Sequence, residues 1–283
     1  MQYFRIMKLP VVFENRFQIL PFFLDDNMCK NGRLMKLPKR GRALIFTDLH
    51  GDLDDYNKYL EKWDFNDPDC HIIIAGDFIH SIYKKDYSLE VLEDMIDKYK
   101  KYDNFHPILG NHEWAHIVGA NVFKANINQK IDFERMIIEK RGSLDPYLAN
   151  YIDFFKSIPF FIQCENGVFV SHAGPSPKIK TYDDYKSIIE GEEYLDRSVY
   201  YVLWSRFEKD YSIEDVSRFL DIVESNVMVI GHNVISEGYE IFGRQMILSS
   251  SFGAEKKLYL DIDLERQISN TDDLIKCLKN LDD

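Results

Sequence analysis

Residues 43–53 read ALIFTDLHGDL, and this stretch decides the fold class. Its apolar start, Ala43 to Phe46, predicts a buried strand, and the residues from Asp52 to Trp63 repeat apolar side chains at helical spacing. Between strand and helix lie Asp48 and His50, two side chains that can bind a metal ion. The order of strand, polar loop and helix predicts an open α/β sheet with a ligand site at its strand ends.

Four more polar motifs follow in the chain, and the first two again come after strand-like apolar runs. All five motifs supply carboxylate, amide or imidazole groups, which together are ligands for two metal ions. None contains sulfur, so the set favours Mn²⁺, Fe or Zn²⁺ in a reactive site over a structural zinc site. The four motifs are Gly76-Asp77, Gly110-Asn111-His112-Glu113, Ser171-His172-Ala173-Gly174 and Gly231-His232-Asn233, and the two runs are Ile72 to Ala75 and His106 to Leu109.

The two halves of the chain predict two kinds of sheet. In the first half, strands alternate with helical patterns such as Leu89 to Tyr99, which indicates parallel βαβ units. In the second half, Asn166-Gly167 between two apolar runs is a hairpin signal. We therefore expect an α/β fold in which two sheets lie face to face with helices outside. The remaining predicted strands are Phe160 to Cys164, Val168 to Ser171, Val227 to Ile230, Gln245 to Ser249 and Lys257 to Ile262, and the remaining helices are Tyr147 to Lys156, Ile213 to Val223 and Asp272 to Leu281.

No linker of Gly, Ser or Pro divides the chain after the first strand, so residues 42–283 are expected to form one catalytic domain. Residues 1–41 contain short apolar pieces, Leu9 to Phe13 and Phe17 to Leu24, broken by prolines. We expect this region to be an N-terminal strand and loop addition packed on the core.

Composition excludes several classes of partner. The formal net charge of −12 argues against duplex nucleic acid, which proteins bind by neutralising phosphates with lysine and arginine. The four cysteines are scattered without a Cys-x-x-Cys pair, as expected for reduced thiols. No run approaches the ~18 apolar residues of a membrane helix, and the start at Met1 lacks a secretory signal. We expect a cytoplasmic protein with no membrane partner, and the sequence predicts no oligomeric state.

With these motifs, the chain from about Ala43 to Ile262 resembles the calcineurin-like metallophosphoesterases, within them the phosphoprotein phosphatases and the related diadenosine tetraphosphatases. Leu203-Trp204-Ser205 is similar to the Leu-Trp-Ser that follows the fourth motif in this group. The resemblance implies a four-layer α/β/β/α sandwich and a centre of two divalent metal ions, with Mn²⁺ the first expectation and Fe or Zn²⁺ the alternatives. It assigns Asp48, His50 and Asp77 to the first ion, and Asp77, Asn111, His172 and His232 to the second.

The second motif departs from the family pattern. The family continues it as Gly-Asp-x-Val-Asp-Arg-Gly, in which the later Asp orients the catalytic His and the Arg holds phosphate. Here the chain reads Gly76-Asp77-Phe78-Ile79-His80-Ser81 and has neither residue. His80 is the candidate for orienting His112, with a structural histidine as the alternative. Arg206 is the candidate for holding phosphate, with a solvated surface charge as the alternative. Weaker candidates for this clamp are Arg244 and Lys84; Trp114, His71, His106 and His116 are expected to be structural.

The resemblance implies a phosphoesterase in which a hydroxide bridging two ions attacks phosphorus while His112 protonates the leaving group as general acid. The first hypothesis for the substrate is a phosphopeptide, as in a serine/threonine protein phosphatase. The alternative is a nucleotide, a dinucleoside polyphosphate or another small phosphoester. A rival from another class is a metal-binding pseudophosphatase that binds a phosphorylated partner without hydrolysis, motivated by the residues found at His80 and Ser81.

Overall fold

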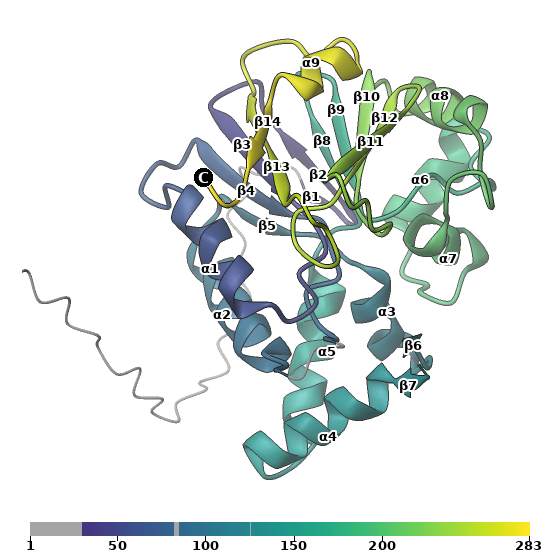
Figure 1. The fold of residues 1–283 in the computed structure, drawn as a ribbon. Coiled ribbons are helices and arrows are strands. Elements are labelled where there is room, and N and C mark those ends of the chain that lie inside the picture. Colours follow the sequence, from purple (N-terminus) through teal and green to yellow (C-terminus); the bar gives the residue numbers. More distant parts are fainter. Residues whose placement is uncertain (1–29, 82–84, 125) are drawn as a thin grey trace, which may run out of the picture.

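The computed structural model describes residues 30–81, 85–124 and 126–283 (Figure 1). The predicted apolar pieces at residues 9–13 and 17–24 lie outside these residues, as does Lys84. Two large sheets form the centre, and helices lie on either side of them. The predicted α/β architecture of two sheets flanked by helices is confirmed. No helix within the described ranges is long and apolar enough to cross a membrane.

The first sheet has five strands in the order β14-β13-β3-β4-β5. Three of them are parallel neighbours, and β13 runs antiparallel to β3. Parallel neighbours put their carboxyl ends at one edge, so the loops that leave these strands lie together. The strands are β3 (Arg42–Phe46), β4 (Cys70–Ile74), β5 (Phe105–Pro107), β13 (Leu258–Asp263) and β14 (Leu278–Asn280).

The second sheet has seven strands in the order β1-β2-β8-β9-β10-β12-β11. The predicted hairpin around Asn166-Gly167 is present, with β8 antiparallel to β9, and β9 is parallel to β10. Because β2 pairs in parallel with β8, residues just before position 41 extend this sheet at one side. The strands are β1 (Lys30–Asn31), β2 (Leu34–Leu37), β8 (Phe161–Cys164), β9 (Val168–Ser171), β10 (Val227–Ile230), β11 (Tyr239–Phe242) and β12 (Gln245–Leu248).

Both faces of each sheet are buried, and alternate residues of a strand pack against different layers. In β3, Ala43 and Ile45 join an apolar cluster with residues of the second sheet, while Leu44 and Phe46 belong to a cluster that includes the helices. Phe46 stacks on Tyr59 of α1 with ring centres 4.1 Å apart. This two-sided burial explains why the strand sequences are continuously apolar. The flanking helices are α1 (Leu53–Lys62), α2 (Ser88–Lys101), α6 (Tyr182–Glu190), α7 (Arg197–Trp204) and α8 (Ile213–Ile222).

Three helices and a small hairpin form a separate group beyond one end of the sheets (Figure 1). The sequence predicted α5 but neither α4 nor the hairpin. The third polar motif begins α3. The group comprises α3 (Asn111–Val118), β6 (Phe123–Lys124), β7 (Ile127–Asn128), α4 (Gln129–Arg141) and α5 (Tyr147–Ser157).

The predicted closing helix from Asp272 to Leu281 is wrong. Only α9 (Thr271–Ile275) is helical, with Asn270 as its N-cap, and the chain then forms β14. β14 pairs antiparallel with β13, which would otherwise be an unpaired edge of the five-stranded sheet. The backbone hydrogen bonds available at that edge favour a strand over a longer helix.

Candidate metal centre

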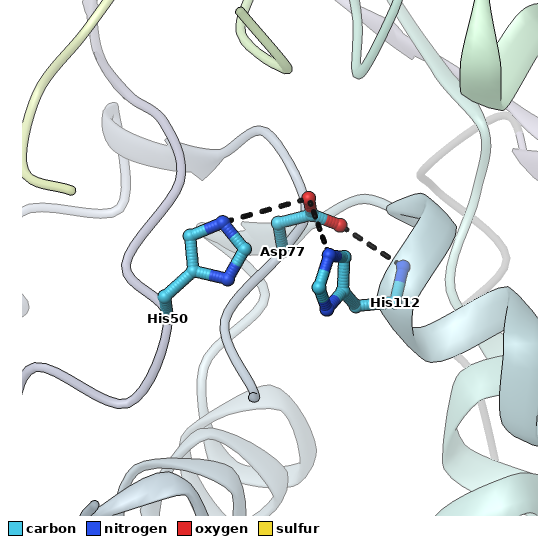
Figure 2. Close-up of side chains that lie close together, drawn as sticks. All are labelled: His50, Asp77 and His112. Carbon is cyan, nitrogen blue, oxygen red and sulfur yellow. Dashed lines mark hydrogen bonds and ion pairs between the residues drawn. The ribbon is translucent and has the colours of Figure 1, made fainter. Parts of the chain in front are cut away.

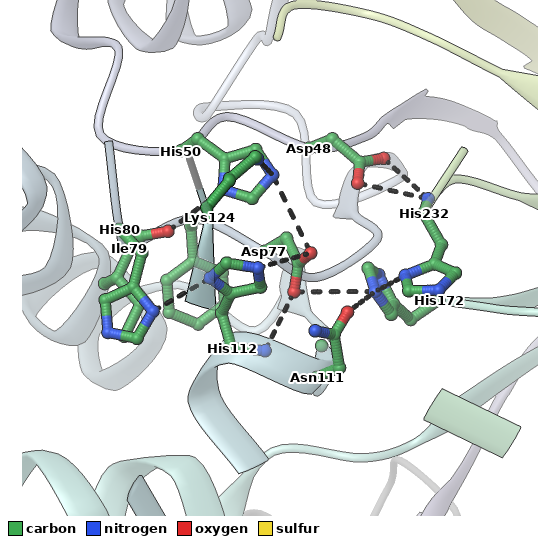
Figure 3. Close-up of polar contacts among 12 residues, drawn as sticks. Asp48, His50, Asp77, Ile79, His80, Asn111, His112, Lys124, His172 and His232 are labelled. Atoms are coloured by element: carbon green, nitrogen blue, oxygen red, sulfur yellow. Dashed lines mark hydrogen bonds and ion pairs between the residues drawn. The ribbon is translucent and has the colours of Figure 1, made fainter. Parts of the chain in front are cut away.

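The five polar motifs meet where the strand ends of the two sheets lie together (Figure 3). The resemblance assigns six residues as metal ligands. Asp48 and His50 follow β3, and Asp77 follows β4. Asn111 begins α3, His172 follows β9 and His232 follows β10. Four backbones in the set adopt the left-handed region, with φ of 47° at Asp48, 47° at His50, 53° at Asp77 and 65° at His232. Such conformations are rare for residues other than glycine and cluster at functional sites. They turn these side chains toward a common point.

One group of candidate ligand atoms consists of His50, Asp77 and His112 (Figure 2). Nε2 of each imidazole lies 3.8 Å from Oδ2 of Asp77. Nδ1 of His50 lies 3.2 Å from the carbonyl oxygen of Ile79. Because a carbonyl only accepts, Nδ1 carries the proton and Nε2 of His50 presents a lone pair to the site. This is the tautomer that a metal ligand needs.

A second group consists of Asp77, His172 and His232, with the amide of Asn111 beside them. Nδ1 of His172 donates to the carbonyl of Ala75 at 2.8 Å, which leaves its Nε2 bare. That Nε2 lies 2.9 Å from Oδ1 of Asn111 and 3.4 Å from Oδ1 of Asp77. Lone pairs that face one another at these distances repel, and a shared cation removes the repulsion. The residues therefore fit the divalent metal ions that the resemblance implies.

Asp48 lies in neither group, although the resemblance places it with His50 and Asp77. Both oxygens of its carboxylate accept the backbone N–H of His232, at 3.1 and 3.0 Å. The pKa of Asp48 is raised to about 7, mainly by burial; His172 opposes this shift, and the charge of Asp77 adds to it. A buried carboxylate with a raised pKa is stabilised in its charged form by a nearby cation.

His112 begins a chain of three buried imidazoles. Its Nδ1 lies 2.8 Å from Nδ1 of His80, and Nε2 of His80 lies 2.8 Å from Nε2 of His116. Nδ1 of His116 is buried and has no hydrogen-bond partner in the described part of the chain. Burial is the main cause that lowers the pKa of all three, and Lys130 lowers that of His116 further, to about 3. The three rings are therefore neutral at pH 7.

Each of the three neutral rings carries one proton on nitrogen. Two of these protons form the hydrogen bonds between the rings, so the third lies at one end of the chain, on Nδ1 of His116 or on Nε2 of His112. A proton on Nδ1 of His116 would be a buried N–H without an acceptor, near the charge of Lys130, and such orphan donors are rare. A proton on Nε2 of His112 faces the carboxylate of Asp77 instead. This tautomer makes His112 a hydrogen-bond donor rather than a metal ligand, although its ring lies within the first group.

Glu113 connects the second and third polar motifs through hydrogen bonds. The sequence predicted no such role for it. Its Oε2 accepts the backbone N–H of Asp77 at 3.0 Å and of Gly110 at 3.1 Å. Its Oε1 accepts those of Phe78 and Ile79, at 3.0 and 3.3 Å. The side chain is fully buried, so these four bonds hold the loop after β4 against the start of α3. In return, Oδ1 of Asp77 accepts the N–H of His112 at 3.1 Å.

The two arginines considered as phosphate clamps occupy different places. Arg206 is exposed, and its Nη1 donates to Oδ1 of Asn233, the neighbour of His232, at 2.5 Å. Burial is the main cause of the lowered pKa of His232, and the charges of His172 and Arg206 add to it, which agrees with a guanidinium close to this histidine. The guanidinium of Arg244 instead binds the carbonyls of Ser217, Ser225 and Asn226 and the carboxylate of Asp221 around the end of α8.

Aromatic rings line the side of the centre near His232. The ring of Trp204 lies 6.1 Å from that of His232, and Trp114 packs edge-on against Trp204 at 6.3 Å. Trp114 is largely buried and donates its Nε1 hydrogen to the carbonyl of Tyr194 at 2.8 Å. Of these two tryptophans, Trp204 is therefore the one next to a candidate ligand. His71 and His106 pair with each other at 2.9 Å, away from this cluster.

Comparisons with known proteins agree with this geometry. The calcineurin-like phosphoesterase family model matches residues 41–256. A serine/threonine-protein phosphatase of Caenorhabditis elegans is 23% identical over 227 residues, which cover 73% of this chain and 46% of that protein. The chain thus spans about half the length of this curated relative.

Two solved structures share the fold. A serine/threonine phosphatase from Saccharomyces cerevisiae, with similarity to human phosphatase PP5, has a TM-score of 0.62 at 18% identity and covers 80% of this chain and 75% of its own. A cold-active protein tyrosine phosphatase of a psychrophilic Shewanella has a TM-score of 0.55 at 17% identity and covers 87% of this chain and 82% of its own. At these identities the likeness concerns the fold alone.

Proposed function

This chain belongs to the calcineurin-like phosphoesterase family, and on that premise we propose that it hydrolyses phosphoric esters with two divalent metal ions. The observation that carries the proposal is the convergence of buried oxygen and nitrogen acceptors on Asp77 from both sheets. The proposed catalytic domain is residues 42–283, with residues 1–41 as an addition to it. Mn²⁺ is the proposed metal, because the set offers carboxylate, amide and imidazole ligands without sulfur.

We propose Asp48, His50 and Asp77 as ligands of one ion, and Asp77, Asn111, His172 and His232 as ligands of the other. When bound, the two ions supply a water activated near neutral pH and positive charge for the phosphoryl oxygens. His112 donates the hydrogen on Nε2 to the leaving oxygen, and His80 orients its ring through the bond between their Nδ1 atoms. Arg206 holds the phosphoryl group from the side of His232, where its guanidinium already lies.

The first substrate class proposed is a phosphoserine or phosphothreonine peptide, because the curated relative is named a serine/threonine-protein phosphatase. Small phosphoesters remain the alternative, since the second motif lacks the Asp and Arg of the phosphoprotein phosphatases. Side-by-side hydrolysis of phosphopeptides, diadenosine tetraphosphate and bis-p-nitrophenyl phosphate with added Mn²⁺ separates these classes. Two bound metal ions without hydrolysis of any phosphoester would favour a pseudophosphatase.

Asp77→Asn tests the centre itself. Asp77 is the residue common to both groups of candidate ligands, so loss of its charge weakens both sites. We expect kcat with Mn²⁺ to fall by at least about a hundredfold, as for loss of a principal electrostatic group. Metal content, measured by elemental analysis after gel filtration, should also fall below that of the wild type. Near wild-type turnover at full metal content would refute the proposal.

A further inference from the structure

Lys124 lies at the edge of the candidate metal centre and was not singled out by the sequence analysis (Figure 3). It belongs to β6 of the small hairpin beside α3, and its Nζ lies 3.4 Å from Nε2 of His50. The same ammonium lies 3.6 Å from the ring centre of Phe252, whose backbone N–H donates to the carbonyl of Asp48 at 3.1 Å. The lysine is thus held over the first polar motif by a cation–π contact.

Among the described residues, no salt bridge neutralises the charge of Lys124. Within the described ranges no carboxylate lies within 4.0 Å of its Nζ, whereas Lys130 and Lys140 of the following helix pair with Glu134 and Glu90 at 2.7 Å. Lys124 donates instead to the bare lone pair of His50. A partly buried ammonium with a single imidazole partner still has N–H donors to satisfy.

That partner is lost when His50 binds a metal ion through Nε2, because the lone pair is then occupied. The ammonium and the cation also repel each other, and the flexible stem of lysine allows Nζ to move toward another acceptor. The centre contains only two carboxylates among its proposed ligands, Asp48 and Asp77. Even when the activated water is a hydroxide, two divalent ions leave an excess of positive charge, and a dianion gains more from it than a monoanion.

The geometry points to Lys124 as a substrate-binding residue that holds a non-bridging oxygen of a phosphomonoester dianion. This inference rests on the proposed function and specifies its substrate class. Lys124 lies beside His50, and Arg206 contacts Asn233, the neighbour of His232, so the two cations lie next to different proposed ligands of the centre. Lys124 thereby supplies the positive charge that the second motif lacks at Ser81. A diester carries one negative charge fewer and gains less from this contact.

Lys124→Met tests the inference because methionine keeps most of the stem and removes the charge. With Mn²⁺, we expect kcat/KM for p-nitrophenyl phosphate to fall by about tenfold or more, the effect of losing a charge-assisted hydrogen bond. For bis-p-nitrophenyl phosphate we expect a loss of less than about threefold. Lys124→Arg should retain most of the monoester activity. Calorimetry of inorganic phosphate binding to the Mn²⁺-loaded protein should show weaker binding in Lys124→Met at unchanged metal content.

Lys101→Met is the matched control, since the Nζ of Lys101 also lies over an aromatic ring, that of Tyr102 at 4.8 Å, at the far end of α2. It should change none of these values. Unchanged monoester kinetics and phosphate affinity in Lys124→Met, or equal losses on both esters, would overturn the inference. If Lys124→Met does not fold, Lys124→Gln takes its place. If the wild type hydrolyses neither these esters nor the phosphopeptides and diadenosine tetraphosphate named above, the proposed function fails, and phosphate affinity still decides the role of Lys124.

Discussion

At the scale of single residues, the histidines of the site differ in what their second ring nitrogen contacts. His50 and His172 each donate from Nδ1 to a backbone carbonyl and present a bare Nε2. His112 contacts His80 instead, and through it His116, whose far nitrogen has no partner within the described part of the chain. These contacts divide similar side chains into candidate metal ligands and a hydrogen-bond donor.

If His112 donates a proton to the leaving group, the effect of replacing it should depend on how basic the leaving group is. In His112→Asn, hydrolysis of phenyl phosphate should fall by about a hundredfold or more, within the range for general acid catalysis. p-Nitrophenyl phosphate should lose distinctly less, because its leaving group needs little protonation. Steady-state kinetics with both esters provide the measurement. His71→Asn is the matched control, since His71 is also a buried histidine paired with another, His106. Equal losses on both esters would exclude His112 as the general acid.

The sequence could predict those residues of the candidate site that belong to a polar motif at the end of a strand. Asp48, Asp77 and His172 each lie within two residues of the end of an apolar run, so the pattern predicts them as site residues. The contact between His116 and His80 depends on how α3 packs against the loop after β4. The position of Lys124 depends on a hairpin of two-residue strands, which leaves no periodic signal. Such residues are brought to the site by tertiary structure alone.

At the scale of elements, Glu113 links β4 to α3. Burial and the charge of Asp77 raise the pKa of Glu113, whereas the backbone N–H groups that it accepts lower it. Because each of its oxygens accepts two N–H groups, the ionised form fits this environment. The loop that carries Asp77 therefore keeps its conformation through a side chain that does not itself belong to either group of candidate ligands.

Glu113→Gln should weaken both the fold and the metal site. The new amide NH₂ cannot accept, so two backbone N–H groups lose their acceptor in a buried place, at a cost of about 2–4 kcal/mol of the free energy of unfolding. Mn²⁺ affinity should fall by about ten- to a hundredfold, as for loss of a residue that orients ligands. Urea unfolding and metal titration give both values. Glu139→Gln on the exposed face of α4 is the control and should change neither; an unaltered metal affinity in Glu113→Gln would contradict this role.

Most strands of the two sheets could be predicted because burial on both faces makes their sequences continuously apolar. Two of the exceptions lie at the edges of the sheets. β11 is only partly buried, and β14 is largely exposed, so neither has an apolar run. Both are strands because a neighbouring strand offers unpaired hydrogen-bonding groups. A single sequence carries no direct sign of that pairing, which explains the wrong helix from Asp272 to Leu281.

At the scale of the whole molecule, the buried centre couples folding to pH. Burial lowers the pKa of five histidines at or beside the centre, to about 4 for His50 and about 3 for His116. These rings are neutral in the folded chain but take up protons in the unfolded chain below its pKa of about 6.5. Their contribution to stability is present above pH 6.5 and is lost as the pH falls through the folded values. Asp48 and Glu113, with raised pKa, act in the opposite direction but are fewer. The other three histidines are His80, His112 and His232.

The metal-free protein should therefore lose stability in mild acid. With a chelator present, we expect Tm to be lower at pH 5 than at pH 7.5. On unfolding, these five histidines and His71 take up more protons than the acids with raised pKa release, which are Asp48, Asp86, Asp97 and Glu113. His116 alone contributes about 2 kcal/mol to this difference if its folded pKa is about 3. His116→Gln should accordingly narrow the difference in Tm between pH 5 and pH 7.5.

Added Mn²⁺ should raise Tm more at pH 7.5 than at pH 5, because protons compete with the metal for the ligands. Asp77→Asn is the control, in which the rise caused by Mn²⁺ should largely disappear. Equal Tm of the chelated wild type at pH 5 and 7.5 would show that the buried histidines do not set its acid stability.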